Sequence, residues 1–249
     1  LRPAAAGPAT LALALPILLT ALFGAAVDGA SRWVSVGPLN LQVSLILLPA
    51  MLLLYARRPD WIGTAGMIVA SVALALQPDR AMAGVLAAGL LAVLVSSRSA
   101  DAIVAAAGGI LAFAATLVSP DGLPAVPYVD GVLYTAFSVH ILAGLAVTIG
   151  AGLLVLPAAI GLWREAGERS AFLAFGTCWA GVIAAAALGN YPTPLVGYGG
   201  SAVLGYLLSV ALLPNGGRVS RPAGASSEPS EDGKGADHSI SELRAPHPA

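Results

Sequence analysis

Long apolar runs separated by short polar segments are the feature that most constrains this sequence. The chain has 249 residues, of which 57% are hydrophobic and 10% are charged. A typical soluble domain carries about a quarter charged residues, so we expect this chain to have lipid as its main solvent. A helix needs roughly 20 apolar residues to cross the hydrocarbon core of a bilayer, with about 17 to 25 as the usual range.

Eight apolar runs are close enough to this length to be interpreted as membrane spans. They cover residues 10–27, 39–55, 62–77, 82–96, 101–118, 132–162, 170–188 and 197–213. The first run is longer than the core of a typical signal peptide, and no clear cleavage site follows it. The sixth is long enough to tilt or to break near Pro157. The sequence therefore predicts an all-α fold: a polytopic membrane helical bundle of about eight transmembrane helices.

The distribution of arginine predicts how the chain is oriented, because cytoplasmic loops carry an excess of Lys and Arg. If the first span runs outward, Arg32 and Arg80 lie outside. The arginines that then lie inside are Arg2, Arg57, Arg58, Arg98, Arg164, Arg169, Arg218 and Arg221. Both termini are predicted to be cytoplasmic. The segments predicted to face outward are 28–38, 77–81, 119–130 and 190–200.

Residues 214–249 differ abruptly from the rest of the chain. They contain Ser, Pro, Gly and charges of both signs, with little to bury, which is typical of disorder. We therefore divide the chain into a transmembrane domain, 1–213, and a disordered cytoplasmic tail, 214–249. The formal net charge of −1 gives no reason to expect a nucleic-acid partner.

Polar residues gather at the predicted outer ends of the spans, as in Gln77-Pro78-Asp79-Arg80. A proline there stops a helix, and Gln and Asp side chains satisfy the backbone groups that the break leaves free. The acid and the arginine either bind an anionic headgroup or hold a loop. His140 lies within the sixth span, where an ionisable residue is a functional hypothesis by default. A neutral histidine hydrogen-bonded between helices is the equally weighted alternative.

Residues 190–202, NYPTPLVGYGGSA, form a polar, glycine-rich segment between two apolar runs. Pro192 and Pro194 prevent a regular helix, and Tyr191 and Tyr198 suit the membrane interface. Irregular backbone at this depth must be buried in protein or line a wet cavity. The segment is therefore a candidate wall of an outward-facing pocket.

Four stretches together resemble motifs of the SEDS family of membrane proteins, named for shape, elongation, division and sporulation. They are residues 28–34 (DGASRWV) with Gly37 and 41–44 (LQVS), residues 76–79 (LQPD), the outer loop that ends in Asp130, and residues 194–201 (PLVGYGGS). The corresponding family motifs are DGAxRWI with FQPSE, LQPDLGTA, the large outer loop and PLPFVSYGGSS. The likeness covers about residues 10–213 in order, spacing and predicted sidedness.

The resemblance implies a cell-wall protein of the bacterial inner (cytoplasmic) membrane that acts in cell division or cell shape. Members polymerise an undecaprenyl-linked disaccharide-peptide, lipid II, at the outer face, usually beside a class B penicillin-binding protein. The implied partners are this lipid-linked glycan, membrane lipid and that transpeptidase. Such chemistry needs a base for the attacking sugar hydroxyl and a site that stabilises the departing pyrophosphate. The sequence requires no cofactor, although it leaves room for a divalent cation.

The resemblance also implies roles for individual residues. Asp130 is the nearest match to the family's catalytic aspartate in the outer loop. The substrate-binding candidates are Arg32, Gln77, Asp79, Arg80, Tyr198, Gly199, Gly200 and Ser201. An ungapped alignment on residues 137–139 instead places Tyr134 at the catalytic position.

The sequence departs from the family pattern at several points. Family members typically have ten spans, three of them before the first motif, whereas here we expect one. Either two N-terminal helices are absent or the start at Leu1 marks a truncation. Around Asp130 the chain reads VPYVDGVLYTAFSVH, without the His-Thr and Phe-Ile-Phe that flank the family's aspartate.

These departures leave an alternative to the enzyme open. In it, the chain is a catalytically silent homologue that binds lipid-linked glycan or scaffolds an envelope synthase. A small-solute transporter is a weaker hypothesis. Transporters bind substrate near the middle of the membrane, whereas the polar groups of this chain gather on one side.

Overall fold

The computed structural model describes residues 5–27, 30–37, 39–119, 126, 128–164, 166–189, 191–194, 196 and 200–214. Its helices and strands belong to one unit, Leu1–Gly216. Apart from Pro214, the predicted cytoplasmic tail lies outside the described residues.

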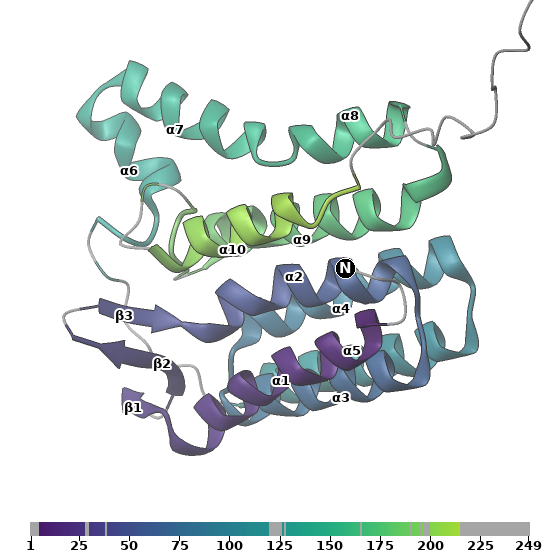
Figure 1. Ribbon diagram of the computed structural model, residues 1–249. Helices are drawn as coiled ribbons and strands as arrows, with labels where there is room; N and C mark the ends of the chain where they lie inside the picture. The colour runs from purple at the N-terminus through teal and green to yellow at the C-terminus, as the bar shows by residue number, and fades with distance from the viewer. Residues whose placement is uncertain are drawn as a thin grey trace, which may run out of the picture. The chain divides into compact units, whose positions relative to one another are not determined.

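The described part of the chain is mainly helical (Figure 1). Its α-helices are α1 (Ala6–Phe23), α2 (Val43–Arg57), α3 (Trp61–Leu76), α4 (Arg80–Ser97), α5 (Ala100–Val118), α6 (Val132–Val139), α7 (Ile141–Leu153), α8 (Leu156–Arg164), α9 (Arg169–Leu188) and α10 (Gly200–Ala211). A 3-10 turn, η2 (Ala166–Glu168), precedes α9. The prediction of a mainly helical chain is thus confirmed.

Within the described residues, five helical segments are long and apolar enough to cross a membrane: α1, α4, α5, α9 and the stretch Ile141–Arg164 that joins α7 to α8. Three other apolar helices, α2, α3 and α10, are shorter, with 15, 16 and 12 residues. The sixth predicted run is broken twice. One break, between Leu153 and Leu156, lies next to Pro157 as predicted, whereas the break at His140 was not predicted.

A small antiparallel sheet lies at the ends of α1 and α2 (Figure 1). It contains β1 (Ala25–Val27), β2 (Ala30–Val36) and β3 (Leu39–Gln42) in the order β1-β2-β3. The all-α prediction did not include this sheet, and most of the segment 28–38 is strand β2, in which Trp33, Val34 and Val36 favour a strand. Val36 pairs with Leu39, so a two-residue turn connects β2 to β3, and Gly37 supplies the positive φ of +59° that such turns need.

The core of the bundle forms around α2, which contacts α1, α9 and α10. Eleven residues of α2 are buried, from Ser44 to Ala56. The largest fully buried side chains of the described residues include Trp179, Phe175 and Tyr55. The Tyr206 ring on α10 packs edge-on against Trp179 and at a tilt against Phe175, both on α9, with centroids 5.1 and 5.8 Å from its own. The short helix α10 is thereby held on α9 by aromatic packing.

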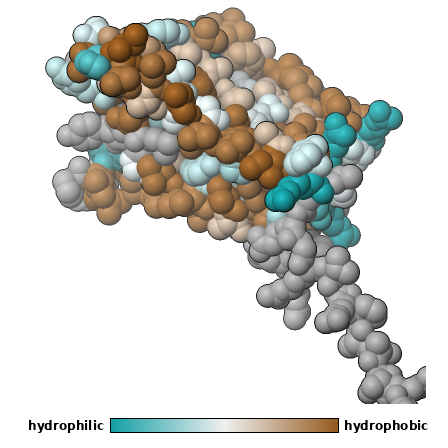
Figure 2. All heavy atoms as spheres, turned by 90° about the horizontal axis from the view of Figure 1, so that it is seen from above, coloured by the Kyte–Doolittle hydropathy of each residue, from teal (hydrophilic) through white to brown (hydrophobic). Residues whose placement is uncertain are grey.

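Apolar side chains also cover much of the outside of the bundle (Figure 2). Leu19, Val95, Leu111 and Leu207, from four different helices, are each more than half exposed, at 54%, 70%, 70% and 58%. Soluble monomers rarely expose large contiguous apolar patches. This surface therefore suits the hydrocarbon interior of a membrane.

Candidate functional site

Six buried polar side chains gather at the end of the bundle that carries the sheet, and we call them the polar cluster. They are Arg32 (β2), Gln42 (β3), Ser44 (α2), Asp79 (between α3 and α4), Tyr191 (before α10) and Ser201 (α10). Each is at most 5% exposed. Burying a polar group costs free energy unless a hydrogen bond compensates. The hydrogen bonds of these side chains therefore decide how these parts of the chain meet.

Asp79 is the centre of the cluster. Its Oδ1 accepts a hydrogen bond from the backbone N–H of Met82 (3.2 Å), so the carboxyl group caps α4. Its Oδ2 accepts bonds from Gln42 Nε2 (3.0 Å) and Ser44 Oγ (3.2 Å). Burial raises the pKa of Asp79, while the charge of Arg32 and these hydrogen bonds act in the opposite direction. The predicted helix stop at Gln77-Pro78-Asp79 is confirmed, because α3 ends at Leu76, and Asp79 caps the start of the next helix, α4.

Gln42 links three separate segments. Its side-chain NH₂ group donates to Asp79 Oδ2 and to Tyr191 Oη, both at 3.0 Å. These two bonds use both hydrogens of the amide, which leaves the longer 3.4 Å approach to Ser44 as a minor contact. The backbone N–H of Gln42 donates to Ser201 Oγ at 2.9 Å. One residue of β3 therefore holds the start of α4, the start of α10 and the segment before α10.

Arg32 and Gln77 hold the end of α3. Arg32 donates through Nη2 to Pro78 O (2.5 Å) and through Nε to Gln77 O (3.4 Å). Cations suit this position because the last carbonyls of a helix carry partial negative charge. Gln77 donates through Nε2 to Ile17 O on α1 (3.0 Å), while its Oε1 is buried without a hydrogen-bond partner. Both side chains contact protein backbone rather than open space.

Asp130 lies beside the segment that contains Tyr191. It pairs with Pro192 in an isolated antiparallel bridge, and the backbone N–H of Thr193 donates to Val129 O at 3.1 Å. The Asp130 side chain is half-buried, and its Oδ2 accepts a hydrogen bond from Val126 N–H (2.8 Å). The carboxylate therefore closes its own turn, while its backbone is attached to the 191–193 segment.

Of the remaining substrate-binding candidates, the structure describes Arg80 and Gly200. The Arg80 guanidinium points to α5, where Nη2 donates to Thr116 O and Ser119 O, both at 3.3 Å. Arg80 thus caps α5 and does not join the polar cluster. Gly200 is exposed at the start of α10, next to the buried Ser201. Tyr198 and Gly199 lie outside the described residues.

His140 and Tyr191 make contacts that were not predicted. His140 is exposed at the break between α6 and α7, and its Nδ1 accepts the N–H of Leu142 at 3.1 Å. His140 therefore caps α7, so its interpretation as a histidine hydrogen-bonded between helices was wrong, whereas its functional role stays a prediction. Tyr191 is 3% exposed, and its hydroxyl is bonded within the cluster.

Gln42, Ser44 and Tyr191 were not predicted as site residues. Gln42 and Ser44 stand at the start of a strongly apolar run, and polar residues in such a place need partners once buried. Their position indicates that both side chains have hydrogen-bond partners. It does not indicate the partners, which come from three other parts of the chain.

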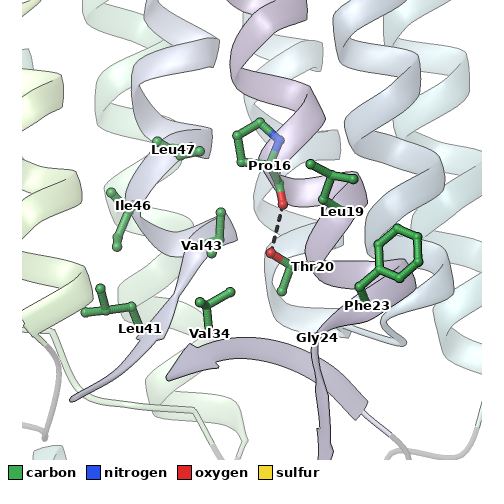
Figure 3. A pocket seen from close by; sticks show the side chains of 10 residues that line it. All are labelled: Pro16, Leu19, Thr20, Phe23, Gly24, Val34, Leu41, Val43, Ile46 and Leu47. Carbon is green, nitrogen blue, oxygen red and sulfur yellow. Dashed lines mark hydrogen bonds between the residues drawn. The ribbon is translucent and has the colours of Figure 1, made fainter. Parts of the chain in front are cut away.

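An open apolar groove of about 450 Å³ lies next to the cluster, between α1 and α2 (Figure 3). It is lined by Pro16, Leu19, Thr20, Phe23, Gly24, Val34, Leu41, Val43, Ile46 and Leu47. Thr20 donates its hydroxyl to Pro16 O at 2.8 Å, so its side chain adds little polarity. Leu41 and Val43 flank Gln42, which puts the groove and the cluster on either side of one short segment. The described residues of 190–202, the expected pocket wall, do not line this groove.

Comparison with models of protein families, with curated proteins and with solved structures finds no match to this chain. Among the described side chains, no group of three or more His, Cys, Asp or Glu is placed to hold a metal ion. The function must therefore be proposed from the residues and contacts themselves.

Proposed function

We propose that the chain is a SEDS-like integral membrane protein of cell-wall synthesis, which polymerises lipid II at the outer face of the bacterial inner membrane. The observation that carries this proposal is the contact between stretches that resemble the family motifs. Arg32, Gln42, Asp79 and Ser201 come from three such stretches and meet in one cluster. Gln42 and Ser201 bond across 159 positions of sequence.

The order of the helices supports an eight-span arrangement with both termini in the cytoplasm. Successive helices begin or end at the polar cluster: α2 starts there, α3 ends there, α4 starts there, and α10 starts there. Arg57 and Arg98 lie at the other ends of α2 and α4, and Arg164 is the last residue of α8. If the chain alternates in this way, we expect these arginines on one side of the membrane, which by the positive-inside rule is the cytoplasm.

The chemistry that we propose depends on Asp130 as the base that removes a proton from the attacking sugar hydroxyl. The half-buried Asp130 is accessible, whereas Arg32, Gln77 and Asp79 are at most 5% exposed. We therefore assign these three residues to holding the helix ends of the site. Gly200 and Arg80, which are less buried, remain the candidates for contact with substrate.

The test is polymerisation by the purified full chain in lipid nanodiscs supplied with lipid II, with glycan products separated by size. Asp130→Asn keeps an oxygen for the Val126 N–H bond and removes the base, so we expect polymerisation to fall by about 10²- to 10⁴-fold. Asp60→Asn is the matched control, because Asp60 Oδ1 also accepts a backbone N–H bond, from Gly63 at 2.7 Å. Full activity in Asp130→Asn would remove Asp130 from this role. A wild-type chain that forms no polymer would overturn the glycosyltransferase itself.

A catalytically silent homologue is the second candidate, and the contacts of the site favour it in one respect. The described donors and acceptors of the cluster are largely satisfied by protein, and the Asp130 carboxylate is engaged in its own turn. This hypothesis predicts no polymer, but retention of lipid-linked glycan or of a class B penicillin-binding protein. Native mass spectrometry that finds neither would count against it.

A further inference from the structure

We infer that Tyr191 is a positioning residue, which through its hydroxyl bond to Gln42 fixes the segment 191–193 and thereby sets the place of Asp130. The inference rests on the proposed function only in giving Asp130 its chemical role. The link itself consists of contacts between described residues and can be tested without any activity.

The first step of the link is the hydrogen bonding of Gln42 to Asp79, which has a fixed position. Asp79 is fully buried and fixed at the start of α4 by the Met82 N–H bond. Gln42 Nε2 lies 3.0 Å from both Asp79 Oδ2 and Tyr191 Oη. The amide therefore connects the tyrosine hydroxyl to the start of α4.

The second step of the link is the contact between the segment 191–193 and the outer loop that ends in Asp130. Pro192 and Pro194 have no N–H, and the N–H of Tyr191 donates to Gly189 O (3.0 Å), so Thr193 supplies the backbone donor that reaches the outer loop, to Val129 O at 3.1 Å. The Thr193 hydroxyl is buried without a hydrogen-bond partner and does not fasten the segment. Because proline fixes φ, the segment is stiff, and a shift of Tyr191 moves the backbone that pairs with Asp130.

The Tyr191 hydroxyl does not titrate in the ordinary working range of pH. Burial, together with the charge of Asp79, raises the pKa of Tyr191 well above its ordinary value of 10.0. Replacing Tyr191 with phenylalanine therefore removes no group that titrates in this range. We expect the substitution to lower the rate without changing the shape of the pH profile.

The experiment compares Tyr191→Phe with Tyr55→Phe in the full chain. Tyr55 is the matched control, because it is 1% exposed and its hydroxyl bonds Thr64 Oγ1 at 2.8 Å, near the far end of α2. Both variants lose one buried hydroxyl and keep the ring. Hydrogen exchange is measured over residues 191–194, where the prolines carry no amide hydrogen, so the signal comes from Tyr191 and Thr193 alone. Polymerisation of lipid II is measured on the same samples.

We expect Tyr191→Phe to speed exchange at Thr193 by about tenfold. We also expect it to lower kcat by about tenfold with KM unchanged, because a small misplacement of a catalytic group slows chemistry more than binding. Tyr55→Phe should change neither quantity. Gln42→Met removes the same link from the other side, and combining it with Tyr191→Phe should add little, as for two residues of one network.

The outcomes separate this inference from the proposed function. Unchanged exchange at Thr193 in Tyr191→Phe overturns the link, whatever the activity. Faster exchange with an unchanged kcat overturns the positioning of Asp130. Faster exchange in a chain whose wild type makes no polymer supports the link, and it is the proposed function that then fails.

Discussion

Gln42 shows how a single residue organises this end of the molecule. Its side chain and backbone donate hydrogen bonds to Asp79, Tyr191 and Ser201. An unsatisfied buried donor or acceptor costs about 1 to 3 kcal/mol, so each of these partners constrains where the others lie. The polar residues of an otherwise apolar chain thus specify which helix ends meet, while apolar packing supplies most of the stability.

The raised pKa of Asp79 predicts a pH dependence of stability. The folded chain binds this proton more tightly than the unfolded chain does, because burial disfavours the carboxylate. The contribution of Asp79 is therefore most favourable below the unfolded carboxyl pKa of about 3.9, and it is lost as the pH rises through the folded-state pKa. Each unit of pKa elevation lowers the free energy of unfolding by about 1.4 kcal/mol at higher pH.

Asp79→Asn removes this titration and keeps a side chain that caps helices well. We expect the melting temperature of the wild type, measured relative to that of the variant, to fall as the pH rises above about 4. Thermal unfolding in detergent over a series of pH values measures this difference, in which the titrations of other groups cancel. A difference that moves the opposite way would mean that Arg32 and the hydrogen bonds outweigh burial.

At the scale of elements, hydrophobic length predicted the helices well and their interruptions less well. The run predicted at 101–118 is α5, Ala100–Val118, because apolar length is a local property of the sequence. The break at His140 depends on a side-chain cap, and β2 depends on pairing with β3. Caps and strand pairs are made with particular partners, so an average over apolar residues does not reveal them.

Close packing between helices predicts the effect of a single methyl group. A Cβ added at Gly66 on α3 would lie 2.8 Å from the backbone N and Cα of Leu11 on α1. The added methyl group would clash with backbone atoms, so α1 and α3 would have to move apart. We therefore expect Gly66→Ala to lower the free energy of unfolding by about 1 to 3 kcal/mol. Thermal unfolding in detergent measures the loss.

Gly150→Ala on α7 is the matched control for this packing. A Cβ there meets nothing within 4 Å, and alanine favours a helix over glycine by up to about 1 kcal/mol. This control should therefore be neutral or stabilising. Equal melting temperatures for Gly66→Ala and the wild type would show that α1 and α3 are not packed as closely as described.

At the scale of the whole molecule, the sequence predicted which residues meet at the site better than it predicted what their side chains contact. Arg32, Asp79 and Ser201 do meet, yet they bond to protein, whereas Arg80 turns away to cap α5. Sequence motifs place residues at the same end of a bundle, since each follows or precedes a helix. Which side chains face each other depends on how the helices are rotated and packed, which the motifs do not encode.

The direction in which the chain crosses the membrane gives the last prediction. Tyr128, between α5 and α6, is 86% exposed, and Gly167, between α8 and α9, is also exposed. If α6, α7 and α8 together make one crossing, these two positions lie on opposite sides. Cys178 is fully buried and is the chain's single cysteine, so Cys178→Ala gives a background in which an introduced thiol reports alone.

We expect a membrane-impermeant maleimide to label Tyr128→Cys in intact spheroplasts and to label Gly167→Cys only after the membrane is permeabilised. The positive-inside rule gives this sign, because Arg164 and Arg169 flank Gly167. Permeabilised samples control for the reactivity of each thiol. Labelling of both positions from outside would mean that the α6–α8 region does not cross the membrane. Labelling of Gly167→Cys alone from outside would place the polar cluster and Asp130 on the cytoplasmic side. Polymerisation of an exported lipid-linked glycan could not occur there.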